Sequence, residues 1–112
     1  MAGDPSHFEL GVQDARRAKA FYGELFGWSF ETTTGENACI ETGGVRGGLH
    51  DGDDASNIVV YFRVLDIEAT VRRVRELGGE ADDPGPSDDG GRFTSCRDDQ
   101  GVHFGLHESP AA

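Results

Sequence analysis

The residues of this chain that could bind a metal ion are four histidines and one glutamate. His7 and Glu9 share one face of a strand predicted over residues 7–13, because successive side chains of a strand alternate between its two faces. Imidazole and carboxylate groups bind divalent ions, although a single strand histidine is more often packed or exposed to solvent. The candidate metal-binding residues are His7, Glu9, His50, His103 and His107.

A second group of residues could bind an organic molecule. Arg46 and Arg63 could hold a carboxylate or phosphate, each through two hydrogen bonds. Tyr61 and Trp28 could stack on a planar or cationic group. Alternatively, Arg46, Arg63 and Glu9 form an ion-pair network across the sheet and bind no ligand. The sequence leaves both interpretations open.

Other kinds of chemistry have no recognisable signature in the sequence. No Ser/His/Asp or Cys/His arrangement is evident, and no glycine-rich loop leads from a strand into a helix to hold a phosphate. The two cysteines, Cys39 and Cys96, lie at an unrelated spacing, which indicates neither a disulfide framework nor a CxxC site. Nucleophilic catalysis and nucleotide binding are therefore not expected.

The candidate residues must be positioned by two copies of one structural unit. The segment from His7 to Gly27 recurs with matching residues from Val59 to Gly79, and each copy has the pattern of a strand followed by a helix. Asp14 and Asp66 are expected to cap these helices. The strands predicted to follow them are 28–33, 37–42 and 45–50 in the first copy and 80–82, 92–97 and 102–108 in the second.

The predicted architecture is an α+β domain with the order βαβββ twice. It extends over residues 1–112, with module one at 6–50 and module two at 57–108. Two related modules imply a pocket between them. The spacing of apolar residues predicts that one stripe of each helix is core. The stripes are Ala18, Phe21, Tyr22, Leu25 and Phe26 in the first helix and Ile67, Val71, Val74 and Leu77 in the second.

The charge of the chain limits its partners. Of its 112 residues, 21 are acidic and 10 are basic, which gives a formal net charge of −11. This charge repels nucleic acids and anionic membranes and would attract a cationic small molecule, although acidity also serves solubility. No apolar stretch is long enough to span a bilayer, and the N-terminal residues do not resemble a secretion signal, so a cytoplasmic protein is expected.

Five segments together resemble the vicinal oxygen chelate superfamily, which includes glyoxalase I, extradiol dioxygenases and bleomycin-resistance proteins. The segments are His7-Phe-Glu-Leu10, Ala18 to Trp28, Val64 to Gly79, Gly91-Arg-Phe93 and Asp98 to Leu106. The resemblance implies that the two modules curl their mixed sheet into a cup with the helices on its outer face. It also implies a homodimer in which cups are completed across a two-fold axis.

The resemblance places the metal ligands of related proteins at His7, Gly48, Val59 and Gly105. Only His7 has a side chain that could bind a metal, so no metal cofactor is expected. The alternative is a displaced set of ligands that recruits His50, His103 or His107. Strand parity also turns the organic-ligand candidates toward the cup: His7, Glu9, Trp28, Arg46, His50, Tyr61, Arg63, His103 and His107.

Three functional hypotheses follow from this comparison. The first is a metal-independent protein that binds a small organic molecule and sequesters a toxin or antibiotic. The second is a metal-dependent lyase, isomerase or dioxygenase of the glyoxalase type that uses the displaced ligands. The third is a non-catalytic subunit with a vestigial cup.

Overall fold

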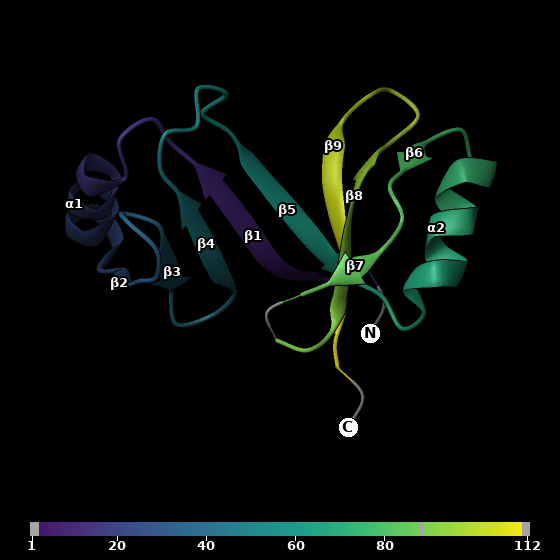
Figure 1. The fold of residues 1–112 in the computed structure, drawn as a ribbon, viewed down its shortest axis with the longest axis horizontal. Helices are drawn as coiled ribbons and strands as arrows, with labels where there is room; N and C mark the ends of the chain where they lie inside the picture. The colour runs from purple at the N-terminus through teal and green to yellow at the C-terminus, as the bar shows by residue number, and fades with distance from the viewer. Residues whose placement is uncertain (1–2, 88, 111–112) are drawn as a thin grey trace. The chain divides into compact units, whose positions relative to one another are not determined.

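The computed structural model describes residues 3–87 and 89–110, which form two compact units (Figure 1). Residues 1, 2, 88, 111 and 112 of the predicted domain lie outside the described residues. One unit is His7–Val59, and the other contains the remaining described residues. The units match the two halves of the repeat, apart from the first residues of the chain, which pack with the second half.

Module one has the predicted βαβββ order. Its elements are β1 (Pro5–Gly11), α1 (Ala15–Phe26), β2 (Ser29–Thr32), β3 (Ala38–Glu41) and β4 (Arg46–His50). The strands pair in the order β2-β3-β4-β1, with β1 parallel to β4 and the other pairs antiparallel. The mixed sheet places the first and last strands of the module side by side, and the long connection that this parallel pair requires runs through α1, β2 and β3.

Module two repeats this arrangement, but the strands at the edge of its sheet are only two residues long. Its elements are β5 (Ile58–Arg63), α2 (Ile67–Glu76), β6 (Glu80–Ala81), β7 (Gly85–Pro86), β8 (Arg92–Arg97) and β9 (His103–Glu108). Strand β5 is parallel to β9, and β8 pairs antiparallel with β9, β6 and β7. The α+β class and the paired βαβββ modules are therefore confirmed, while the short strand β7 lies between the predicted strands 80–82 and 92–97, where no strand is predicted.

Both helices begin as predicted. The side-chain Oδ1 of Asp14 accepts a hydrogen bond from the backbone N–H of Arg17 at 3.1 Å, and that of Asp66 accepts one from Ala69 at 3.0 Å. These bonds satisfy backbone donors that have no partner inside the helix. Gly27 ends α1 with a left-handed φ of 74°, which glycine adopts without a steric penalty.

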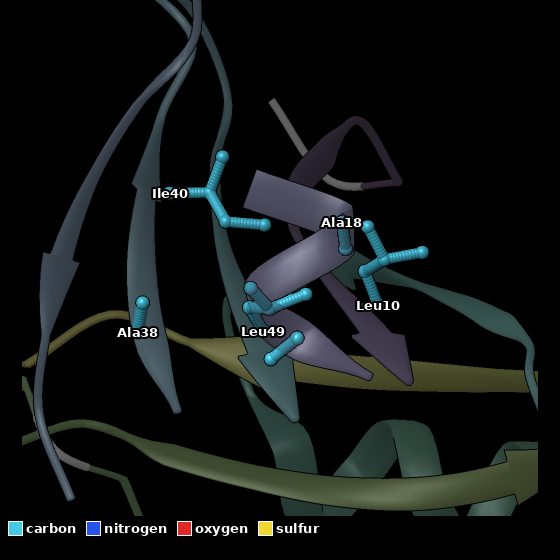
Figure 2. Close-up of a cluster of buried hydrophobic side chains, with 6 residues drawn as sticks. Leu10, Ala18, Ala38, Ile40 and Leu49 are labelled. Carbon is cyan, nitrogen blue, oxygen red and sulfur yellow. The ribbon is translucent and has the colours of Figure 1, made fainter. Parts of the chain in front are cut away.

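Each module has its own hydrophobic core between its helix and its sheet. In module one, side chains of α1 meet those of the strands, as Figure 2 shows for Ala18, Leu10, Ile40 and Leu49. The core of module two is formed by Val64, Ile67, Val71, Cys96 and Leu106. Strand side chains that point toward the helix therefore belong to the core. The residues next to them in the chain point to the opposite face of the sheet.

The predicted core stripe of α1 is partly wrong. Ala18 is buried and Tyr22 packs against the core, but Phe21, Leu25 and Phe26 are exposed. The buried residues of this helix are Ala15 and Ala18. Because alanine is small, the helix lies close to the sheet, and the larger side chains lie on either side of the contact between helix and sheet. Leu77, just after α2, is exposed as well, whereas Ile67 and Val71 are buried as expected.

No helix in the described part of the chain is long and apolar enough to cross a membrane.

Candidate functional site

The polar candidates lie on the face of each sheet that its helix does not cover, which we call the open face. In module one the parallel register sets His7 beside Arg46 and Glu9 beside Gly48. His50 has the same parity as Gly48 and follows it on β4. The open face of module one therefore brings together four of the predicted site residues, His7, Glu9, Arg46 and His50, and it contains two of the four predicted ligand positions, His7 and Gly48.

The carboxylate of Glu9 joins the two histidines of this face. Its Oε2 accepts a hydrogen bond from Nε2 of His7, and its Oε1 accepts one from Nε2 of His50. Burial alone would raise the pKa of Glu9, but the hydrogen bonds and the charges of the two imidazoles outweigh burial and lower it. Glu9 is therefore an ionised carboxylate held at both oxygens.

Glu9 also occupies the space that a side chain at position 48 would need. A Cβ atom built on Gly48 would lie 2.6 Å from Oε2 and 2.8 Å from Oε1 of Glu9. These distances are far below van der Waals contact between carbon and oxygen. Gly48 therefore leaves room for the carboxylate of Glu9, and a side chain at position 48 would require the flexible end of Glu9 to move.

On the open face of module two, too, a side chain lies over a glycine of the neighbouring strand, and here the side chain is an aromatic ring. Tyr61 and Gly105 are neighbours on the parallel strands β5 and β9. A Cβ atom on Gly105 would lie 2.2 to 2.6 Å from atoms of the Tyr61 ring. The ring of Phe93 lies against Tyr61, with 6.2 Å between centroids and an angle of 60°. Two aromatic side chains thus cover the face where module one has a carboxylate.

The two histidines of β9 are held by partners within their own compact unit, which includes Ser6 at the start of β1. His107 contacts Oδ2 of Asp89 through Nε2 at 2.8 Å and the hydroxyl of Ser6 through Nδ1 at 3.5 Å. Three hydrogen bonds lower the pKa of Asp89. In order of decreasing effect, they come from the hydroxyl of Ser87, the backbone of Gly91 and the side chain of His107. His103 Nε2 lies 2.5 Å from the hydroxyl of Ser95.

Arg63 makes an incomplete ion pair with Asp4. Its Nη2 lies 3.4 Å from Oδ2 of Asp4, and a backbone hydrogen bond of 2.8 Å from Arg63 to Asp4 fixes the two residues side by side. Arg63 Nε and Asp4 Oδ1 are buried and have no hydrogen-bond partner among the described residues. A guanidinium binds a carboxylate best through two parallel hydrogen bonds. In this pair, Arg63 Nε and Asp4 Oδ1 do not take part in such a bond.

Of the two interpretations that the sequence leaves open for the arginines, the ion-pair network with Glu9 does not form. Arg46 Nε pairs with Glu41 at 3.2 Å, and Arg63 pairs with Asp4. Glu9 instead bonds to the two histidines, because the parallel register brings β4 alongside β1 with His50 within its reach. Both arginine pairs are about half exposed, and such pairs contribute little to stability.

Trp28 does not face the open side as predicted. Its ring stacks on Tyr22, with 5.2 Å between centroids and an angle of 14°, and also contacts Phe8 and Phe26. This aromatic cluster packs against the core of module one, on the side that α1 covers. Trp28 follows directly after the helix, and burial of its large ring against the helix determines its direction.

The histidine and glutamate side chains of module one do not converge on one point. His7 and His50 bind opposite oxygens of a single carboxylate. Within the described residues there is no group of three or more His, Cys, Asp or Glu side chains that could hold a metal ion. The absence of a metal cofactor stays a prediction, to be tested in solution.

Cys96 is not a nucleophile, and this leads to a labelling experiment. Burial, and then the charge of Asp82, raise the pKa of its thiol to about 11, so almost no thiolate exists near neutral pH. We expect iodoacetamide to modify the partly exposed Cys39 in the folded protein and to modify Cys96 only after unfolding or as the pH approaches 11. Mass spectrometry of peptides measures this order; equal rates in the folded state would contradict it.

Sequence reasoning missed several residues of the open face of module two. Phe93 and Ser95 pair with His107 and Gly105 on β9, and alternation along the predicted strand 92–97 would have placed them there. Asp4 lies before the first predicted strand, and its pairing with Arg63 has no signal in the sequence. Asp89 lies in a loop whose path the sequence pattern does not fix.

Comparison with known proteins supports the fold. A family model described as bleomycin resistance protein-like N-terminal matches residues 6–43, and no curated protein sequence matches the chain. Methylmalonyl-CoA epimerase from Mycobacterium tuberculosis has a similar structure, with 21% identity, a TM-score of 0.73, and coverage of 97% of this chain and 89% of that one. The predicted likeness to the vicinal oxygen chelate superfamily is thus confirmed at the level of the fold.

Two other solved structures show the same fold. A hypothetical protein from Bacillus halodurans C-125 has 16% identity and a TM-score of 0.76, with coverage of 98% of this chain and 96% of that one. A Streptomyces coelicolor methylmalonyl-CoA epimerase variant in complex with 2-nitronate-propionyl-CoA has 18% identity and a TM-score of 0.71, with coverage of 99% and 100%. At these identities the likeness concerns the fold, and function must be argued from the residues of this chain.

Proposed function

We propose that this protein binds a small organic molecule without a metal ion and sequesters it. The observation that carries this proposal is the filling of two predicted ligand positions. Glu9 occupies the space above Gly48, and Tyr61 occupies the space above Gly105. A metal site built from these positions would need donors there, and the neighbouring side chains already take the room.

The chemistry of module two favours an organic anion with a planar part. Tyr61 and Phe93 offer aromatic surface, and Arg63 has a buried Nε that is not hydrogen-bonded within the described residues. A ligand carboxylate could replace the single contact of Asp4 with a bidentate pair. Sequestration of an antibiotic or toxin is consistent with the bleomycin-resistance-like family model.

The experiment compares two probes of equal size and opposite charge, benzoate and benzylamine. Isotope-labelled protein is treated with EDTA, and backbone amide signals are followed by NMR during each titration. We expect benzoate to shift signals around Arg63 and Tyr61, with or without EDTA, and benzylamine to leave them in place. No response to benzoate, or a response that needs added metal, would contradict the proposal.

A matched pair of variants tests the role of Arg63. We expect Arg63→Gln to weaken benzoate binding by roughly 10-fold or more, the effect of losing a charged hydrogen bond. Arg46→Gln is the control, because Arg46 is also a half-exposed strand arginine with an acidic partner. Asp4→Asn should strengthen binding, since it removes the charge that competes for Arg63. Equal losses for the two arginine variants would show that only net charge matters.

The second candidate function is a metal-dependent lyase, isomerase or dioxygenase of the glyoxalase type. The observation that favours it is that His7, Glu9 and His50 lie on one face of module one, where the side chains would have to rearrange to meet at a metal ion. The thermal midpoint of EDTA-treated protein titrated with Mn, Ni, Zn, Fe(II) and Mg ions separates the two candidates. Saturation 100-fold above the dissociation constant would add about 2.7 kcal/mol of stability. A shift abolished by His7→Ala would support the enzyme, whereas we expect none.

A further inference from the structure

Three polar side chains from separate parts of the chain lie in a row near the end of β9. Asp89 is in the loop before β8, His107 is on β9 and Ser6 is at the start of β1. Nε2 of His107 lies 2.8 Å from Oδ2 of Asp89, and its Nδ1 lies 3.5 Å from the hydroxyl oxygen of Ser6. A carboxylate, an imidazole and a hydroxyl in this order activate serine nucleophiles in unrelated folds.

The loop that carries Asp89 is held in place by several contacts. Oδ1 of Asp89 accepts hydrogen bonds from the hydroxyl of Ser87 and, at 2.8 Å, from the backbone N–H of Gly91. A Cβ atom on Gly91 would lie 2.2 Å from the carbonyl oxygen of Glu108, so the glycine lets this loop lie against the end of β9. Because Oδ1 has these two donors, Oδ2 is the oxygen that contacts His107.

The charge of Asp89 determines which nitrogen of His107 carries the proton. The hydrogen bond from Ser87, followed by that from Gly91, holds the pKa of Asp89 below its ordinary value, so the carboxylate is ionised and only accepts hydrogen bonds. Nε2 of a neutral His107 must therefore donate to Asp89, and the lone pair of Nδ1 faces the hydroxyl of Ser6. The distance of 3.5 Å is longer than in a strong hydrogen bond, and such contacts shorten when a substrate binds.

Apolar surface lies beside the imidazole. Phe93 is opposite His107 in the antiparallel register of β8 and β9, so the two side chains share one face of the sheet. The residue Phe93 is 40% exposed, and Ser6 is only partly buried. An aryl group could pack on Phe93 while the carbonyl carbon of an ester reaches Ser6. The net charge of −11 disfavours an anionic substrate, so an uncharged aryl ester fits best.

We propose that this protein also hydrolyses uncharged aryl esters, with Ser6 as the nucleophile, His107 as the general base and Asp89 as a positioning residue. Oγ of Ser6 bonds to the carbonyl carbon, and its proton moves to Nδ1 of His107. The tetrahedral intermediate then expels the aryl oxygen, which takes this proton and leaves as a phenol. Water, deprotonated by the same nitrogen, attacks the acyl carbon, releases the carboxylic acid and restores the hydroxyl of Ser6.

The sequence alone does not predict this activity. Ser6 and His107 are 101 positions apart, and His107 and Asp89 are 18 positions apart. No short motif joins the three residues, and only the pairing of the strands and the path of the loop bring them together. The expectation that nucleophilic catalysis is absent therefore depends on local patterns that this arrangement does not use.

Reaction with p-nitrophenyl acetate tests the proposal. We expect a burst of about one equivalent of nitrophenolate, because this good leaving group makes acylation faster than hydrolysis of the acyl-enzyme. Mass spectrometry of peptides should find the acetyl group on Ser6. Lys19, the single lysine of the chain, is the internal reference for acetylation by the reagent alone. We expect Ser6→Ala to remove the burst and His107→Gln to slow acetylation of Ser6 by roughly 100-fold or more.

Two variants of Asp89 separate a positioning role from a structural one. Asp89→Asn can donate to Nε2 of His107, which favours the tautomer with the proton on Nδ1, and should slow acetylation of Ser6 by roughly 10-fold or more. Asp89→Glu keeps a carboxylate and should restore much of the rate. Equal losses for the two variants would contradict the role of Asp89.

Ser95 provides the matched control for the nucleophile. Its hydroxyl lies 2.5 Å from Nε2 of His103, and no acidic side chain in the described segments contacts this histidine. We expect no acetyl group on Ser95, and Ser95→Ala should leave the acetylation of Ser6 unchanged. Acetylation of Ser6 no faster than that of Lys19, an undiminished burst in Ser6→Ala, or an unchanged rate in His107→Gln would each overturn the proposal.

Discussion

Replacing Ile67 by alanine should lower the free energy of unfolding by about 2 to 5 kcal/mol, the range for large-to-small substitutions in a packed core. Ile67 is the first residue of α2 and has 0% of its surface exposed. It packs with Val71 and Leu106 in the core of module two. Alanine at this site removes apolar contacts and leaves a cavity between the helix and the sheet, which urea unfolding followed by circular dichroism would measure.

The matched control for this prediction is Ile58→Ala. Ile58 has the same side chain on β5, but 62% of its surface is exposed. Its replacement should change the free energy of unfolding by less than about 0.5 kcal/mol, as is usual for exposed positions. Similar losses for the two variants would show that Ile67 is not part of a closely packed core.

Gly105→Ala should lower the free energy of unfolding by about 1 to 3 kcal/mol, the usual cost of overpacking. The added Cβ would lie 2.2 Å from the ring of Tyr61, so either the ring or β9 must move. In a Tyr61→Ala background the same substitution should cost nothing, because the colliding ring is absent. The difference between the two backgrounds is the coupling energy of the pair, which a double-mutant cycle measures.

Gly85→Ala is the control for this cycle. Gly85 lies on a strand of the same module, and a Cβ atom built on it would meet nothing within 4 Å. Its substitution should be neutral or slightly stabilising, because alanine restricts the unfolded chain more than glycine does. A loss at Gly85 as large as that at Gly105 would mean that the collision with Tyr61 is not the cause.

The sequence predicts most of the fold because its local signals agree with one another. The repeat gives the two modules, and Asp14 and Asp66 give the starts of the helices. Strand parity also places His7 and Glu9 on the same face. These features depend on residues that are near one another in the chain, so the pattern alone contains them.

The parts that the sequence does not predict depend on contacts between distant segments. The bond from His50 to Glu9 requires the parallel register of β1 and β4, which no short pattern specifies. The direction of Trp28 depends on its stacking against Tyr22 after the helix has ended. The exposure of Phe21 depends on how close α1 lies to its sheet, which the alanines of the contact determine.

In both modules a large side chain of one strand lies over a glycine of the neighbouring strand. The type of that side chain sets the chemistry of the open face, whereas the strands beneath it have the same arrangement in both modules. The same arrangement accepts a carboxylate at position 9 and an aromatic ring at position 61. A single substitution at position 9 or 61 therefore changes the recognition group of one half while the other half keeps its own. Exchange of these two residues offers a route to designed variants with altered ligand preference on an unchanged scaffold.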